Sequence, residues 1–125
     1  MVPILFQVAL GGAIGSAARY LTGVVVLRAF GSGFPLGVLT VNLIGSFLMG
    51  VFVIWAGRSS ISHLSPFVMT GLLGGYTTFS AFSLESVTLI ERGQIGSATL
   101  YLILSIGGAM CALFVGVLLA REIWP

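Results

Sequence analysis

The stretch Thr70–Glu85 places glycines, hydroxyl groups, aromatic rings and one carboxyl group inside an otherwise apolar run. Its glycine and threonine pairs predict an interruption of a membrane helix near residues 74–78. Thr77 or Thr78 would then cap a helix that resumes at Phe79. Broken membrane helices bind ions, because freed carbonyl groups coordinate cations and helix N-termini favour anions. A glycine-rich packing face, with hydroxyl groups bonded to their own backbone, is the alternative interpretation.

Three side chains after the interruption share one sector of the expected helix. Phe79, Phe82 and Glu85 follow at intervals of three residues, which places them within roughly 120° of arc. Ring edges carry partial positive charge and can meet an anion. Glu85 is the only acidic residue within an apolar run, and ionisable groups at such positions are costly and usually functional. Its partner could be Arg19, or hydroxyl groups could bond to the protonated carboxyl group.

The other apolar runs add neutral hydrogen-bonding groups. Asn42, the only asparagine, has two amide donors, and Ser46 follows one turn later on the same face. Tyr101 and Ser105 are also one turn apart. Each group could instead form an ordinary interhelical hydrogen bond. Together they predict a site that is rich in neutral donors and poor in fixed charge, which suits weak binding of a small anion.

Enzymatic chemistry is not expected from the residues of this chain. It contains no Asp, no Lys and a single histidine, His63, in a polar connection. These residues cannot supply a catalytic triad or a cluster of metal-binding side chains. The phosphate-binding pattern Gly-x-x-x-x-Gly-Lys is absent as well. We therefore predict that the protein is not an enzyme.

The elements that must position these groups are membrane helices. Of the 125 residues, 58% are hydrophobic and 6% are charged, whereas an average soluble domain has about 25% charged residues. Five basic and three acidic residues cannot cover a water-facing surface, and they form no basic patch for nucleic acid. The composition therefore predicts an integral membrane protein without a nucleic-acid partner. The apolar runs lack the alternation that is typical of barrel strands.

Four apolar runs are long enough to cross a bilayer, which requires about 20 residues per helix. We predict an all-α protein that forms a single transmembrane domain over residues 1–125, with a broken third helix. The expected spans are residues 4–26, 36–56, 66–90 with a break near 74–78, and 97–120. Small residues at four-residue spacing in all four spans also predict closely packed helices, within one subunit or between subunits.

The arginines favour neither orientation in the membrane. Four spans place Arg58 and Arg121 on the side of both termini, whereas Arg28 and Arg92 lie on the opposite side. The positive-inside rule needs a clear excess of basic residues on one side. The balance is compatible with insertion in both orientations and with antiparallel homodimers. A small protein can also have an even count by chance.

Over essentially its whole length, the sequence resembles the Fluc (CrcB) family of fluoride channels. The resemblance is carried by Gly11–Arg19, Gly37–Gly45 and, most specifically, by the motif Gly-Gly-x-Thr-Thr-Phe-Ser-x-Phe-Ser-x-Glu within Thr70–Glu85. It implies a fluoride-selective channel that exports cytoplasmic fluoride passively, down its electrochemical gradient. It also implies an antiparallel homodimer with two pores in the lipid bilayer of a bacterial inner membrane.

The resemblance also assigns roles to individual residues. The anion pathway would contain Arg19, Asn42, Thr78, Phe79, Ser80, Phe82, Glu85, Tyr101 and Ser105. The backbone carbonyls of Gly74 and Thr77 would hold a structural sodium ion at the dimer interface, and no organic cofactor is expected. Ala81 and Ala109 stand where the family often has hydroxyl residues, so two groups of the polar track are missing here.

A small proton-coupled multidrug exporter is the alternative function. Such exporters resemble the expected architecture, because they are four-span, dual-topology dimers with a membrane glutamate. Their glutamate lies in the first span, however, where this chain has only Arg19. Here Glu85 is in the third span, beside a break that those exporters lack. A non-transporting assembly subunit is a third possibility, which the polar residues inside the spans disfavour.

Overall fold

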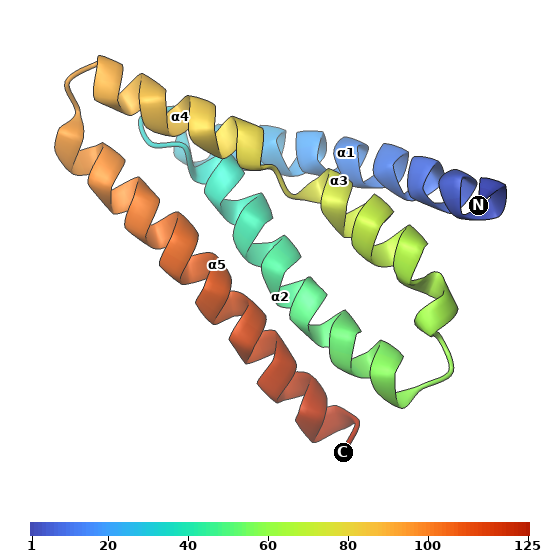
Figure 1. Cartoon of the computed structure of the whole chain (residues 1–125). Helices are drawn as coiled ribbons and strands as arrows, with labels where there is room; N and C mark the ends of the chain where they lie inside the picture. The colour runs from blue at the N-terminus through green and yellow to red at the C-terminus, as the bar shows by residue number, and fades with distance from the viewer.

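The computed structural model describes all 125 residues and consists of helical segments and their connections (Figure 1). The segments are α1 (Val2–Phe30), α2 (Leu36–Arg58), the 3-10 turn η1 (Ser62–Leu64), the π-helical η2 (Pro66–Leu73), α3 (Gly74–Tyr76), α4 (Phe79–Glu91) and α5 (Ile95–Ile123). The predicted all-α class and the broken third membrane helix are confirmed.

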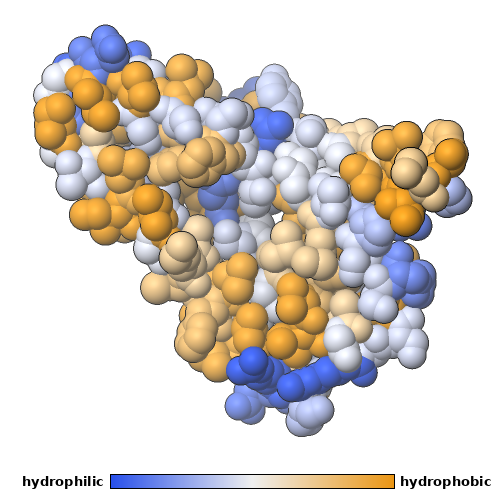
Figure 2. All heavy atoms as spheres, viewed as in Figure 1, coloured by the Kyte–Doolittle hydropathy of each residue, from blue (hydrophilic) through white to orange (hydrophobic).

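Three helices are long and apolar enough to cross a membrane: α1 and α5 with 29 residues each, and α2 with 23. At about 1.5 Å per residue, even the shortest exceeds the roughly 30 Å of hydrocarbon in a bilayer. The segments η2, α3 and α4 together form the remaining span, which is the third along the chain and is not one continuous helix. Hydrophobic side chains cover much of the face in Figure 2, and hydrophilic ones gather at the bottom, where α2 and α5 end.

Glycines let α1 lie directly against the backbone of η2. A Cβ atom added to Gly11 would overlap the carbonyl oxygen of Phe67, and one added to Gly15 would overlap that of Leu72. The contact moves to higher residue numbers in both segments, so they run in the same direction. The predicted close packing of small residues is therefore confirmed within one subunit at these positions.

The helices α2 and α5 lie side by side in the same way (Figure 1). A Cβ atom on Gly50 would overlap the carbonyl oxygen of Leu113, and one on Gly116 would overlap that of Phe47. These reciprocal contacts fix the relative depth of the two helices. Residues near the middle of α2 therefore face the middle of α5.

Aromatic contacts hold both ends of the α2–α5 pair. Phe34, just before α2, packs edge-to-face on Tyr101, with ring centroids 5.7 Å apart. At the other end Trp55 stacks on Trp124 at 5.6 Å, and Arg58 donates a hydrogen bond to the Trp124 carbonyl. Because both ends are tied, the polar residues between them are held in a defined register.

Candidate functional site at the helix break

The break between α3 and α4 is formed by Thr77 and Thr78, which both have extended backbone. The Thr78 hydroxyl accepts a hydrogen bond from the backbone N–H of Ala81 at 3.1 Å. Thr78 is therefore the N-cap of α4, one of the two caps that the sequence allowed. The hydroxyl of Ser80 lies 3.3 Å from that of Thr78 and is exposed.

Asn42 of α2 fixes the geometry of this break. Its amide nitrogen donates to the Thr78 carbonyl at 3.2 Å, and the Thr78 backbone N–H donates to its amide oxygen at 2.8 Å. One side chain thus satisfies both backbone groups of the residue at which the helix stops. An amide nitrogen carries two hydrogens, so one N–H of Asn42 remains for another partner.

The four carbonyl groups of residues 74–77 lose their helical donors at the break, and two of them are those of Gly74 and Thr77. The N–H that would bond to Gly74 belongs to Thr78, which donates to Asn42 instead. The N–H that would bond to Thr77 belongs to Ala81, which donates to the Thr78 hydroxyl. Backbone carbonyls released in this way are suitable ligands for a cation. Of the two carbonyls between them, that of Gly75 accepts a hydrogen bond from Arg19 Nε at 3.0 Å.

A hollow of about 400 Å³ opens beside the break, between α2 and α5; we call it the phenylalanine hollow. Its lining residues are Asn42, Gly45, Ser46, Met49, Thr77, Thr78, Phe79, Phe82, Ser105, Ile106, Ala109, Met110 and Leu113. The hollow brings together five residues of the predicted pathway: Asn42, Thr78, Phe79, Phe82 and Ser105. No side chain in its lining carries a formal charge.

The two phenylalanines of the hollow differ in exposure. Their ring centroids are 5.5 Å apart, but Phe79 is 78% exposed whereas Phe82 is only 7% exposed. Phe82 packs against Tyr101, with centroids 5.4 Å apart. The Phe79 ring therefore lacks comparable cover within the chain, and the hollow is open on its side.

Two buried hydroxyl groups near the rings have no hydrogen-bond partner. Tyr101 is fully buried, and neither its hydroxyl nor that of Ser105 is paired within the chain. Buried hydroxyl groups are normally bonded, because desolvation without a partner is costly. Ser105 lines the phenylalanine hollow, whereas Tyr101 touches it through Phe82. Both oxygen atoms are shielded from solvent in the single chain, so a hydrogen bond from either hydroxyl to an ion requires the hollow to open toward it.

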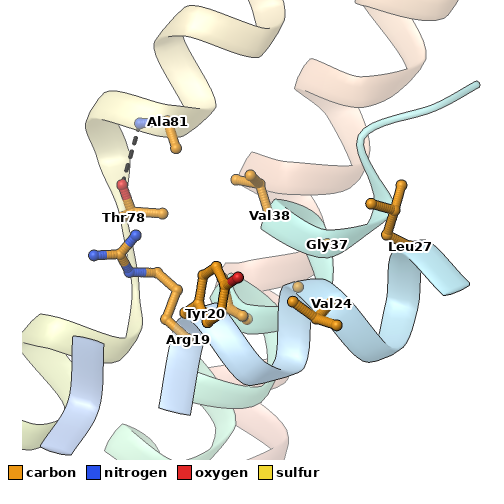
Figure 3. A pocket seen from close by; sticks show the side chains of 10 residues that line it. Arg19, Tyr20, Val24, Leu27, Gly37, Val38, Thr78 and Ala81 are labelled. Atoms are coloured by element: carbon orange, nitrogen blue, oxygen red, sulfur yellow. Dashed lines mark hydrogen bonds between the residues drawn. The ribbon is translucent and has the colours of Figure 1, made fainter. Parts of the chain in front are cut away.

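Arg19 lines a second hollow of about 340 Å³, which also reaches Thr78 (Figure 3). Apolar side chains such as Val24 and Val38 form much of its wall. Figure 3 shows the guanidinium group directed toward the end of the helix at which Thr78 lies. Because only Nε is bonded, to the Gly75 carbonyl, the outer nitrogens of Arg19 remain unpaired. Thr78 is the residue that both hollows share.

The possible Arg19–Glu85 pair is not formed. Arg19 bonds to the backbone at the break, whereas Glu85 lines a third hollow of about 220 Å³ near the connection from α1 to α2. The alternative of hydroxyl partners also fails, because Ser83 and Ser86 donate to carbonyls of their own helix. Glu85 lies one turn beyond Phe82 in the same sector of α4, but it does not line the phenylalanine hollow.

Sequence reasoning missed the lower part of the phenylalanine hollow. Met49, Met110 and Leu113 line it, although none of them has a polar group that would attract notice. Helical spacing contains the signal, because Met49 lies two turns after Asn42 on the same face of α2. Leu113 likewise lies two turns after Ser105 on α5.

Comparison with known proteins gives a consistent result. The family model described as CrcB-like protein, Camphor Resistance (CrcB), matches residues 6–117, a range that includes every residue of the candidate site. A protein of Ruegeria sp. (strain TM1040) named fluoride-specific ion channel FluC is 60% identical over 98% of both chains. Proteins with the same name from Roseobacter denitrificans and Caulobacter vibrioides are 53% and 47% identical, each over 96% of this chain and 97% of the relative.

These matches extend over nearly the whole chain and agree with the structure. The three long apolar helices and the relatives make this a multi-pass membrane protein. The family match includes the break, Asn42 and both phenylalanines. The chain therefore belongs to the CrcB family.

Proposed function

We propose that this protein is a fluoride-selective ion channel that lets cytoplasmic fluoride leave the cell passively. The observation that carries the proposal is the phenylalanine hollow, which offers neutral donors and ring edges but no formal charge. The relatives named as fluoride-specific channels support the choice of ion. An exporter driven by protons would need an acidic group in its substrate site, and Glu85 lies in a different hollow.

Fluoride is small and strongly hydrated, so a channel must replace its water with other donors. Here the free N–H of Asn42, the hydroxyl of Ser105 and the edges of the phenylalanine rings are available. The N-terminus of α4 also directs its positive dipole end toward this region. Neutral donors hold an anion less tightly than arginine or lysine would, which allows release at the far side. The gradient supplies the driving force.

We also propose that two copies form an antiparallel homodimer in the bacterial inner membrane. The exposed Phe79 ring and the open side of the phenylalanine hollow leave a half-built pathway that a second copy would close. The even distribution of arginines supports insertion in both orientations. Each dimer would then have two equivalent pathways.

The carbonyls of Gly74 and Thr77 are proposed to hold a structural sodium ion between the two copies. Both have lost their helical donors, and each copy would contribute the same oxygens around a shared axis. Such an ion would supply positive charge that stabilises the helix break. It would take no part in the movement of the anion.

Fluoride efflux from liposomes that contain the purified protein tests the main proposal. An electrode should record rapid loss of fluoride, whereas chloride-loaded liposomes should lose almost none. Phe79→Ile should reduce the efflux strongly, because the exposed ring edge is lost while an apolar side chain is kept. Phe114→Ile is the matched control, since Phe114 is an exposed ring on α5 outside the hollow. Equal chloride and fluoride efflux, or no efflux, contradicts the proposal.

The dimer and the sodium ion are tested separately from conduction. Light scattering in detergent should give twice the mass of one chain, and tags at the C-terminus should report both sides of the membrane in cells. Prolonged replacement of sodium by N-methylglucamine should lower the melting temperature of the dimer, and sodium should restore it. A single orientation contradicts the antiparallel dimer. An unchanged melting temperature contradicts the sodium site.

A further inference from the structure

The phenylalanine hollow changes from polar to apolar along its length. Its hydrogen-bonding residues on α2 and α5, namely Asn42, Ser46 and Ser105, lie toward the N-terminal part of both helices. Met49 and Leu113 lie farther along, at similar depth, because Gly50 lies against the Leu113 carbonyl. The hollow therefore ends in apolar side chains.

The sequence extends this contrast beyond the hollow. No hydroxyl, amide or charged side chain occurs on α2 between Ser46 and Arg58, or on α5 between Ser105 and Arg121. An anion that has passed Ser46 and Ser105 toward this end meets no hydroxyl, amide or charged donor from either helix for more than two turns. Met49, Met110 and Leu113, which we call the apolar collar, line the hollow from about the level of Ser46 to its apolar end.

We propose that the apolar collar, once the second copy of the proposed dimer covers its open side, is the constriction that limits the rate of conduction; this inference rests on the function proposed above. Narrow apolar segments resist water, and an ion that has to pass them loses solvation. The collar would therefore set the height of the main barrier, whereas the donors above it set the affinity. Methionine side chains are unbranched and flexible, so Met49 and Met110 can move aside for passage.

A purely structural role of the collar does not match its exposure. Met110 is 70% exposed and Leu113 is 39% exposed, and Met49 is half-buried. None of the three belongs to the buried core of the subunit. Substitutions at these positions should therefore leave the subunit folded, and an effect on ion flux can be separated from an effect on stability.

The decisive experiment measures fluoride efflux from liposomes with Met49→Ser, beside the unchanged protein and Met49→Leu. Serine adds a hydroxyl donor and removes apolar volume at the collar, so the efflux should rise at least about fivefold, equivalent to about 1 kcal/mol of barrier. Leucine keeps the site apolar, adds no donor and is branched and less flexible, so the efflux should not rise. Leu113→Thr, on the facing helix, should also raise the efflux.

The outcomes separate the collar from the channel function itself. If the unchanged protein conducts fluoride but neither Met49→Ser nor Leu113→Thr conducts faster, the collar does not limit the rate and the inference is wrong. A rise in fluoride efflux with Met49→Leu as large as with Met49→Ser also overturns the inference, because the added hydroxyl donor would then not be the cause of the rise. If the unchanged protein passes no fluoride, the proposed function fails first. Chloride-loaded liposomes with the same variants should lose almost no chloride, which distinguishes faster conduction of fluoride from a nonspecific leak; an equal rise in chloride efflux overturns the inference.

Discussion

The helix crossings and the helix break use the backbone in opposite ways. At the crossings, Gly15 and Gly50 bring helices so close that carbonyl oxygens of the neighbouring segment occupy the space of a side chain. At the break, Thr77 and Thr78 pull the backbone out of its helical bonding and leave carbonyls without helical donors. The first arrangement fills space with backbone, and the second exposes backbone for other partners.

This contrast explains how a chain of 125 residues can support an interruption inside a membrane. Unpaired backbone groups are costly in hydrocarbon, so the segments around them must be held firmly. The glycine contacts supply this rigidity on both sides, through α1 against η2 and through α2 against α5. Asn42 then extends from the rigid pair to the break. The site therefore depends on these two glycine-packed pairs of helical segments, which we call the frame.

Gly15→Ala should have the largest effect, because it breaks the frame. The added methyl group would overlap the carbonyl oxygen of Leu72, which is backbone and cannot rotate away. Overpacking typically costs about 1–3 kcal/mol, and overlap with a rigid backbone atom is expected at the upper end of that range, so the yield of folded protein in size-exclusion chromatography should fall strongly. Gly12→Ala is the matched control, since nothing lies within 4 Å of its added Cβ atom. Equal yields of both variants would show that the crossing is not rigid.

Asn42→Leu should have the next largest effect, because it disconnects the break from the frame. It leaves the N–H and the carbonyl of Thr78 without partners, at about 1–3 kcal/mol for each unsatisfied group. Both the melting temperature and the fluoride efflux should fall. Gln7→Leu is the control, because Gln7 is also an amide in a membrane helix but its oxygen has no partner to lose. Unchanged fluoride efflux with Asn42→Leu would show that the break keeps its geometry without the hydrogen bonds from Asn42.

The same contrast separates what the sequence predicts from what it does not. Residues that act through local geometry were predictable: the glycines, the cap at Thr78 and the break itself. The bonds from Asn42 to Thr78 join residues 36 positions apart, and no local pattern specifies such a partner. The choice of Gly75 over Glu85 as the partner of Arg19 also depends on how α1 packs. The π-helical form of η2 has no signal in its residue types.

Thr78→Ala should have a moderate effect that is confined to the break. It removes the acceptor for the Ala81 N–H, and loss of such a cap costs about 1 kcal/mol. The melting temperature should fall by a few degrees, and Thr78→Ser should restore most of the loss because it keeps the hydroxyl. Thr88→Ala serves as control, since the Thr88 hydroxyl only donates to a carbonyl of its own exposed helix face. A larger fall in melting temperature with Thr88→Ala than with Thr78→Ala would show that the Thr78 cap does not stabilise the break.

Ala109→Ser should have the smallest effect, and it tests whether the donors of the phenylalanine hollow or its apolar collar limit the rate. Ala109 lines the phenylalanine hollow on α5, one turn after Ser105, so serine adds a donor above the apolar collar. If the collar limits the rate, an extra donor before the barrier should change the efflux by no more than about twofold, or about 0.4 kcal/mol. The same substitution should have a larger effect when it is combined with Met49→Ser, because the barrier then lies elsewhere. Ala112→Ser, outside the hollow, should change neither background. A strong gain from Ala109→Ser alone would place the barrier among the donors instead of at the collar.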